Sequence, residues 1–102
     1  MIYMESKHWE IVKKILQKYP YIFYAFGSRV KGTQKKLSDL DICFMDSIPT
    51  HIISDIREDF EESNLPFVVD LVDWKTCDEK FRLHIKPDLL LIQESTKTIE
   101  EQ

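Results

Sequence analysis

The stretch GSRVKGTQKKLSDLD, residues 27–41, contains both glycines of the 102-residue chain and ends with two aspartates one residue apart. Glycine allows backbone conformations that other residues avoid, and it lets the chain approach another group closely. If Asp39 and Asp41 lie on a strand, they project from the same face, because successive strand side chains alternate between faces. The stretch therefore indicates either a ligand-binding loop or a plain turn between two strands.

Apolar segments lie on both sides of this loop. Residues 21–26, YIFYAF, predict a strand that is buried on both faces. Residues 39–45, DLDICFM, predict a second strand whose apolar side chains point away from the two acids. Two more strands are expected at 66–72 and 89–92. The loop at 27–38 would therefore join two neighbouring elements of one sheet.

Helical spacing of apolar residues predicts helices at 5–18 and at about 50–63. A third helix is expected to begin with the capping box Thr76-x-x-Glu79, to turn Phe81 and Ile85 inward, and to end before Pro87. Helices and strands alternate along the chain. We therefore expect an α/β (α+β) fold, in which helices cover a small mixed sheet of about four strands.

The composition bounds the function. A chain of 102 residues predicts one domain, 1–102, with its core at about 21–92. A formal net charge of −4 argues against a protein that binds nucleic acid directly by charge alone. Its two cysteines form no zinc pattern, and no segment predicts a membrane span or a signal peptide. We expect a cytoplasmic protein with reduced thiols.

The acids indicate a metal site. Asp39 and Asp41 would repel each other by about 4 kcal/mol at about 4 Å and an effective dielectric of about 20, which a divalent cation such as Mg²⁺ would offset. Asp70 interrupts an apolar strand, and it could join them if that strand lies beside the second. Three carboxylates could then hold two metal ions. The alternatives are ordinary turn chemistry at Ser38 and Asp39, and an edge-strand acid at Asp70.

The glycine end of the loop indicates an anion site. Gly27 follows a buried strand directly, and Ser28 could cap a short helical turn over 29–31. Unpaired backbone N–H groups at such a turn bind anions. Gly32 would let the chain leave the turn. A phosphate site would then lie one strand width from the acids.

These residues resemble a known signature. Gly27-Ser28, ten intervening residues and Asp39-x-Asp41 resemble the Gly-Ser-x10-Asp-x-Asp motif of the polymerase-β-like nucleotidyltransferase superfamily. The fuller strings Gly-Ser-Arg-x-x-Gly and Ser-Asp-x-Asp resemble the minimal nucleotidyltransferases of prokaryotes. Asp70 matches the third acid of that family. Val30 departs from the family pattern, because many relatives carry alanine at this position.

The resemblance implies a nucleotidyltransferase fold and the transfer of a nucleoside monophosphate with release of pyrophosphate. Gly27 and Ser28 would hold the triphosphate, with Arg29 and Ser38 also in the nucleotide site. Asp39 and Asp41 would coordinate two Mg²⁺ ions. Asp70 would bind the ion nearer the acceptor and help to activate the acceptor hydroxyl. Lysines 31, 35 and 36 either touch phosphates or belong to a solvated loop.

The resemblance also implies a partner. Minimal nucleotidyltransferases are often encoded beside HEPN-domain toxins, which they neutralise by adenylylating a tyrosine. We therefore expect a Mg²⁺-dependent protein adenylyltransferase that uses ATP and acts as an antitoxin. The alternatives are a binding module that blocks its partner by occlusion, and a nucleotide-sensing subunit. The residues leave open the choice of nucleoside triphosphate, the acceptor and the oligomeric state.

Overall fold

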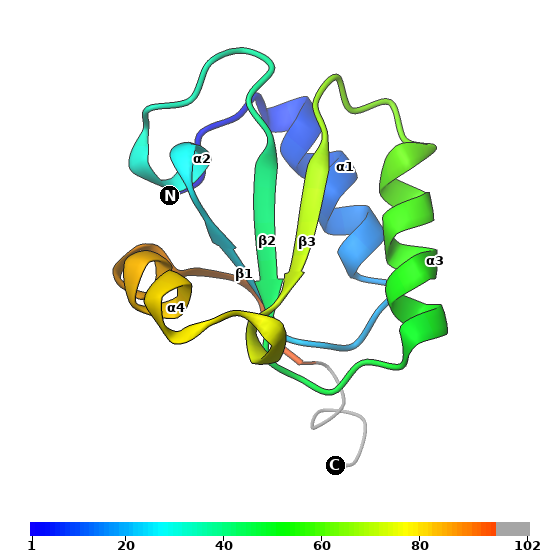
Figure 1. The fold of residues 1–102 in the computed structure, drawn as a ribbon. Helices are drawn as coiled ribbons and strands as arrows, with labels where there is room; N and C mark the ends of the chain where they lie inside the picture. The colour runs from blue at the N-terminus through cyan, green and yellow to red at the C-terminus, as the bar shows by residue number, and fades with distance from the viewer. Residues whose placement is uncertain (96–102) are drawn as a thin grey trace.

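The computed structural model describes residues 1–95, which form one four-stranded sheet and its covering helices (Figure 1). The α-helices are α1 (Ser6–Leu16), α2 (Ser28–Lys31), α3 (Thr50–Glu61) and α4 (Glu79–Ile85). The strands are β1 (Phe23–Phe26), β2 (Leu40–Phe44), β3 (Val69–Asp73) and β4 (Leu90–Gln93). Two short 3-10 helices, η1 (Trp74–Thr76) and η2 (Lys86–Asp88), flank α4. The expected class, a small mixed sheet covered by helices, is confirmed.

The sheet has the strand order β3-β2-β1-β4. β1 runs antiparallel to both β2 and β4, whereas β2 and β3 are parallel and are joined through α3. β3 begins at Val69 rather than at residue 66, because Phe67 turns into the core and Pro66 has no N–H for a ladder. The parallel pairing places the acidic ends of β2 and β3 side by side.

The two faces of the sheet differ. α1 and α3 pack on one face and enclose the main apolar core, which includes Leu40, Ile42 and Phe44 as the sequence predicts (Figure 1). α4 lies over the other face, where a smaller cluster joins Ile85 to the sheet. That face is only partly covered, so it retains room for a ligand.

The start of α4 corrects the predicted capping box. Asp78, not Thr76, is the N-cap residue, and its carboxylate accepts the N–H of Phe81 at 2.8 Å. The Thr76 hydroxyl instead donates to the carbonyl of Asp73 at 3.0 Å, at the end of η1. Asp forms an N-cap as readily as Thr. With Thr76 and Asp78 both available as N-caps, the sequence did not fix where α4 begins.

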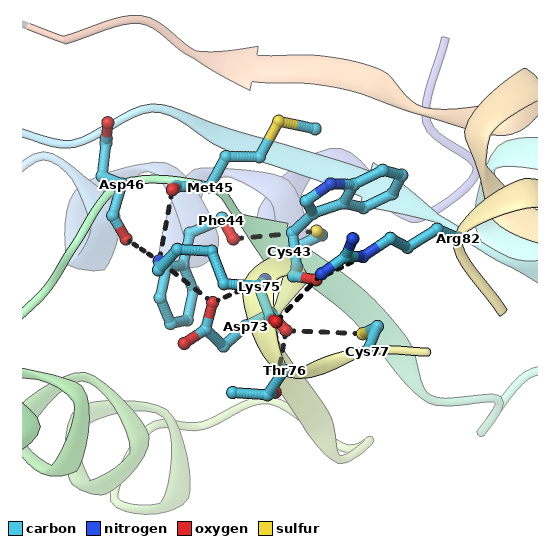
Figure 2. A network of polar contacts seen from close by, with 10 residues as sticks. Cys43, Phe44, Met45, Asp46, Asp73, Lys75, Thr76, Cys77 and Arg82 are labelled. Carbon is cyan, nitrogen blue, oxygen red and sulfur yellow. Dashed lines mark hydrogen bonds and ion pairs between the residues drawn. The ribbon is translucent and has the colours of Figure 1, made fainter. Parts of the chain in front are cut away.

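A network of polar contacts fastens α4 to the ends of β2 and β3 (Figure 2). Lys75 Nζ donates to the carbonyls of Met45 and Asp46, at 3.2 and 2.7 Å, and pairs with Asp73 Oδ1 at 3.1 Å. Arg82, within α4, donates through Nε to the carbonyl of Trp74 at 3.0 Å. These contacts hold α4 at a set position above the sheet.

At the opposite edge of the sheet, the Gln93 side chain connects β4 to the segment between α1 and β1. Its Nε2 atom donates to the carbonyls of Leu16, Tyr19 and Tyr21 at 2.9, 2.8 and 3.0 Å. One side chain of β4 therefore connects the end of α1 to the turn before β1, where the carbonyls of Leu16 and Tyr19 also accept backbone N–H groups. Within residues 1–95, no helix has the length and apolar character to cross a membrane.

Candidate active site

A pocket of about 310 Å³ lies between the open face of the sheet and α4, and we call it the acidic pocket. Residues of the sheet, of the α2 region and of the α4–η2 region line it: Phe26, Asp41, Asp70 and Val72; Gly27 and Lys31; and Phe81, His84, Ile85 and Asp88. Two of the three predicted carboxylates therefore lie in one pocket with the predicted phosphate-binding glycine.

The sheet register brings the acids together. Asp41 of β2 is the direct neighbour of Asp70 in the parallel ladder with β3. Adjacent strands lie about 4.8 Å apart, and cross-strand neighbours project from the same face. Asp39 directly precedes β2 and does not line the pocket, but its charge acts on Asp41. Asp41 is half-buried, whereas Asp39 and Asp70 are exposed, so the group is open to solvent on one side.

The acids also interact electrostatically. The pKa of Asp41 is raised from 3.8 to about 6, first because burial disfavours the charged form and then because Asp70 and Asp39 carry like charges. Among residues 1–95, no ion pair neutralises any of these three carboxylates. Their charge is therefore uncompensated within this part of the chain, which favours a bound cation.

The donor set fits Mg²⁺ chemically, because Mg²⁺ takes carboxylate oxygens together with substrate phosphates. As the side chains lie, no three His, Cys, Asp or Glu residues within 1–95 are grouped closely enough to hold a metal ion. Like charges oppose close approach. A shared ion would therefore require the exposed side chains of Asp39 and Asp70 to rotate toward Asp41.

Gly27 is required by the position of Asp41. Its backbone has φ 83° and ψ −159°, a region that is essentially restricted to glycine. A Cβ atom built at this position would lie 2.3 Å from Asp41 Oδ2. The close approach that the glycine permits is therefore to the carboxylate of the predicted metal site.

The turn after Gly27 has the predicted conformation with a different cap. Ser28 is the first residue of α2, and Gly27 occupies the N-cap position without a side-chain hydrogen bond. Ser28 was expected to cap the turn, but a residue inside a helix cannot act as its N-cap. Within 1–95, the N–H groups of Ser28 and Arg29 make no hydrogen bond, as a phosphate site at this turn would require. Gly32 ends α2 with φ 80°.

Arg29 corrects another expectation. It was predicted in the nucleotide site, but it is only 3% exposed and donates to the carbonyls of Tyr3, Lys36 and Ser38 at 3.0, 3.1 and 3.0 Å. Its guanidinium also lies 4.0 Å from the centre of the Phe67 ring, and burial lowers its pKa. Arg29 therefore holds the loop at 33–38 against the N-terminal segment.

Ser38 also belongs to the packing of this loop. Its Oγ accepts the backbone N–H of Lys35 at 2.7 Å, and neither Ser38 nor Ser28 lines the acidic pocket. Lys31 does line it, and its Nζ lies 3.4 Å from Asp88 Oδ2 on the opposite side. The structure thus brings Gly27, Asp41, Asp70 and a cation together, and it gives Arg29 and Ser38 structural contacts.

The α4 side of the pocket contains residues that the sequence argument did not assign to the site. Phe81 and His84 of α4 and Asp88 of η2 line the pocket together with Asp41 and Asp70. Phe81 was expected to be buried, but it is 38% exposed and contacts Phe26 edge to face at 6.1 Å between ring centres. The i, i+3 spacing of Phe81 and His84 was the available signal, but it predicts a shared helix face without saying what that face contacts.

Comparison with known proteins is consistent with this geometry. The profile of the family described as polymerase beta, nucleotidyltransferase matches residues 10–97. A protein of Haemophilus influenzae, described as a probable protein adenylyltransferase, MntA, is 44% identical over an alignment of 102 residues. That alignment covers 96% of this chain and 90% of the relative.

Two solved structures share the fold. A crystal structure of a toxin–antitoxin with AMP-PNP has a TM-score of 0.65 at 23% identity, and covers 90% of this chain and 77% of its own. A crystal structure of a mutant of the toxin–antitoxin MntA–HpeT has a TM-score of 0.59 at 20% identity. The match covers 89% of this chain and 76% of the chain in that structure. At this identity the likeness is one of fold.

Proposed function

Because the chain belongs to the polymerase β nucleotidyltransferase family, we propose that it transfers AMP from ATP to a protein hydroxyl and releases pyrophosphate. The observation that carries this proposal is the pairing of Asp41 with Asp70 in adjacent strands, directly beside Gly27. A carboxylate pair next to a turn with unpaired N–H groups suits a ligand that combines phosphates with Mg²⁺.

Each residue has a role in this proposal. Asp39 and Asp41 would hold two Mg²⁺ ions, and Asp70 would hold the ion nearer the acceptor. Bound Mg²⁺ would neutralise phosphate charge and polarise the reacting phosphate. The N–H groups after Gly27 would receive the triphosphate, and the Ser28 hydroxyl would donate to it.

In this proposal, Asp70 would accept the proton of the acceptor hydroxyl. It is exposed at the edge strand, where a second protein can approach, whereas Asp41 is half-buried beside Gly27. The hydroxyl oxygen would bond to the α-phosphorus of ATP as the bond to pyrophosphate breaks, and the proton would pass to Asp70. The exposed carboxylate of Asp70 would therefore face the acceptor, and the half-buried carboxylate of Asp41 would face the nucleotide.

We further propose that the acceptor is a HEPN-type toxin and that the protein acts as its antitoxin in the cytoplasm. The name of the Haemophilus influenzae relative supports the adenylyl transfer, and the two toxin–antitoxin structures support such a partner.

Intact-mass measurement tests the proposal. The folded protein is incubated with ATP, Mg²⁺ and a HEPN-domain protein of the same genome, and the partner should gain the mass of one AMP. Asp41→Asn and Asp39→Asn should abolish the gain, whereas Asp55→Asn should keep it, because Asp55 is exposed on α3, across the sheet from the pocket. A partner of unchanged mass would refute the proposed transfer.

The same reagents separate the two alternatives. If a triple Asp→Asn variant at positions 39, 41 and 70 neutralised the toxin as well as wild type, the protein would act by occlusion. If wild type bound ATP with Mg²⁺ in calorimetry but released no pyrophosphate with its partner present, it would be a nucleotide sensor.

A further inference from the structure

In the acidic pocket, carboxylates and an aromatic ring lie at opposite ends of one row of sheet residues, and the Lys31–Asp88 ion pair also lines the pocket. Phe26, Asp41 and Asp70 form a single row across β1, β2 and β3, because Phe26 is paired with Asp41 and Asp41 with Asp70. Phe81 stands over the Phe26 end of this row, in edge-to-face contact with that ring. A ligand that fills the pocket would meet carboxylates at one end and aromatic surface at the other.

Two exposed residues of α4 line the pocket, Phe81 and His84, and Phe81 is the apolar one of the two. Ile85, one turn later, is buried, and Leu83 is 63% exposed but does not line the pocket. Phe26 contacts Phe81 edge to face, so this contact leaves part of the Phe81 surface open, and the side chain is 38% exposed. An exposed ring in a ligand-sized pocket is a surface on which a flat ligand can stack.

We propose that Phe81 binds the nucleobase of the nucleoside triphosphate by stacking, and this inference rests on the proposed function. Gly27 follows Phe26 directly, so the predicted phosphate turn begins where the aromatic end of the pocket stops. A nucleotide with its base against Phe81 would therefore direct its phosphates toward Gly27 and Asp41. Stacking tolerates any base, so Phe81 contributes affinity rather than the choice of base.

Calorimetry with two ligands tests this assignment. ATP carries a base and inorganic tripolyphosphate does not, and both are titrated with Mg²⁺ into the full-length protein. Phe81→Leu should weaken ATP binding about tenfold, within the range measured for base–aromatic stacking. It should leave tripolyphosphate binding unchanged, whereas Phe81→Trp should retain the affinity for ATP.

Leu83→Ala is the matched control, because Leu83 is an exposed apolar residue of the same helix outside the pocket, and it should change neither affinity. If Phe81 only supported the pocket, Phe81→Leu would weaken both ligands equally, which would overturn the proposal. Unchanged ATP binding with a raised KM for the protein acceptor would also overturn it. A wild-type protein that bound neither ligand would refute the proposed function as well.

Discussion

Replacement of Gly27 by alanine should lower both the catalytic rate and the stability. The two effects have different causes and can be measured separately. The new methyl carbon would lie 2.3 Å from Asp41 Oδ2, whereas ordinary van der Waals contact begins at 3.4 Å, so the carboxylate must retreat by about 1 Å. A displacement of about 1 Å at a reacting group can lower the rate about 100-fold. We expect Gly27→Ala to lower the rate of pyrophosphate release by at least that factor.

The same substitution also has a cost in stability. A residue other than glycine at φ 83° and ψ −159° is strained by about 1–3 kcal/mol. Urea unfolding should therefore show a free energy of unfolding lower by about that amount, with a folded protein still present at low urea.

Gly32→Ala provides the control for strain alone. Gly32 also has a positive φ, 80°, and its Cβ would meet the Tyr3 ring at 3.2 Å rather than a carboxylate. The left-handed conformation costs about 1–2 kcal/mol for alanine. Gly32→Ala should therefore lose stability but keep its activity. If Gly27→Ala released pyrophosphate as fast as Gly32→Ala, the contact between Gly27 and Asp41 would have no catalytic importance.

Three further substitutions test the site and its supports. Asp41→Asn should raise the free energy of unfolding at pH 7 by up to about 3 kcal/mol, because the folded wild type must ionise a carboxyl whose pKa is raised from 3.8 to about 6. The difference in the free energy of unfolding should be absent below pH 3.8 and should grow as the pH rises to about 6. Urea unfolding at several pH values checks this, and a difference that is the same at every pH would contradict it. Arg29→Lys should destabilise by about 3 kcal/mol or more, since lysine cannot bond three carbonyls in the same geometry; a midpoint shift in urea too small for 1 kcal/mol would argue otherwise. Gln93→Leu should cost about 1–3 kcal/mol in the same assay, because the Tyr21 carbonyl would lose its side-chain donor while those of Leu16 and Tyr19 keep backbone donors; an unchanged midpoint would exclude that role.

Local patterns predicted most of the secondary structure. The apolar periodicity of α1 and α3 and the alternation in β2 depend on near neighbours, and these elements differ from prediction by two residues or fewer at each end. The common direction of Asp39 and Asp41 followed from the period of a strand. The approach of Asp70 required one further condition, a third strand beside the second, and the β2–β3 ladder meets it.

The incorrect expectations concern side chains whose positions depend on segments that are distant in sequence. Arg29 turns inward because the carbonyl of Tyr3 and the ring of Phe67 lie beside it, and neither is near it in sequence. Phe81 is partly exposed because α4 is held above the sheet through Lys75 and Arg82. Periodicity places Phe81 on the inner stripe of α4, but only the tertiary position of the helix shows that this stripe borders a pocket.

The pairing of β1 with β4 has a consequence for synthesis of the protein on the ribosome. Phe23 pairs with Gln93, so β1 receives its edge partner β4 only after residue 93 has been translated. α4, which closes the acidic pocket, also belongs to the last quarter of the chain. A nascent chain that ends before α4 contains Gly27, Asp39, Asp41 and Asp70 but lacks Phe81. Competence to bind a nucleotide should therefore arise only after α4 has been translated and can pack on the sheet.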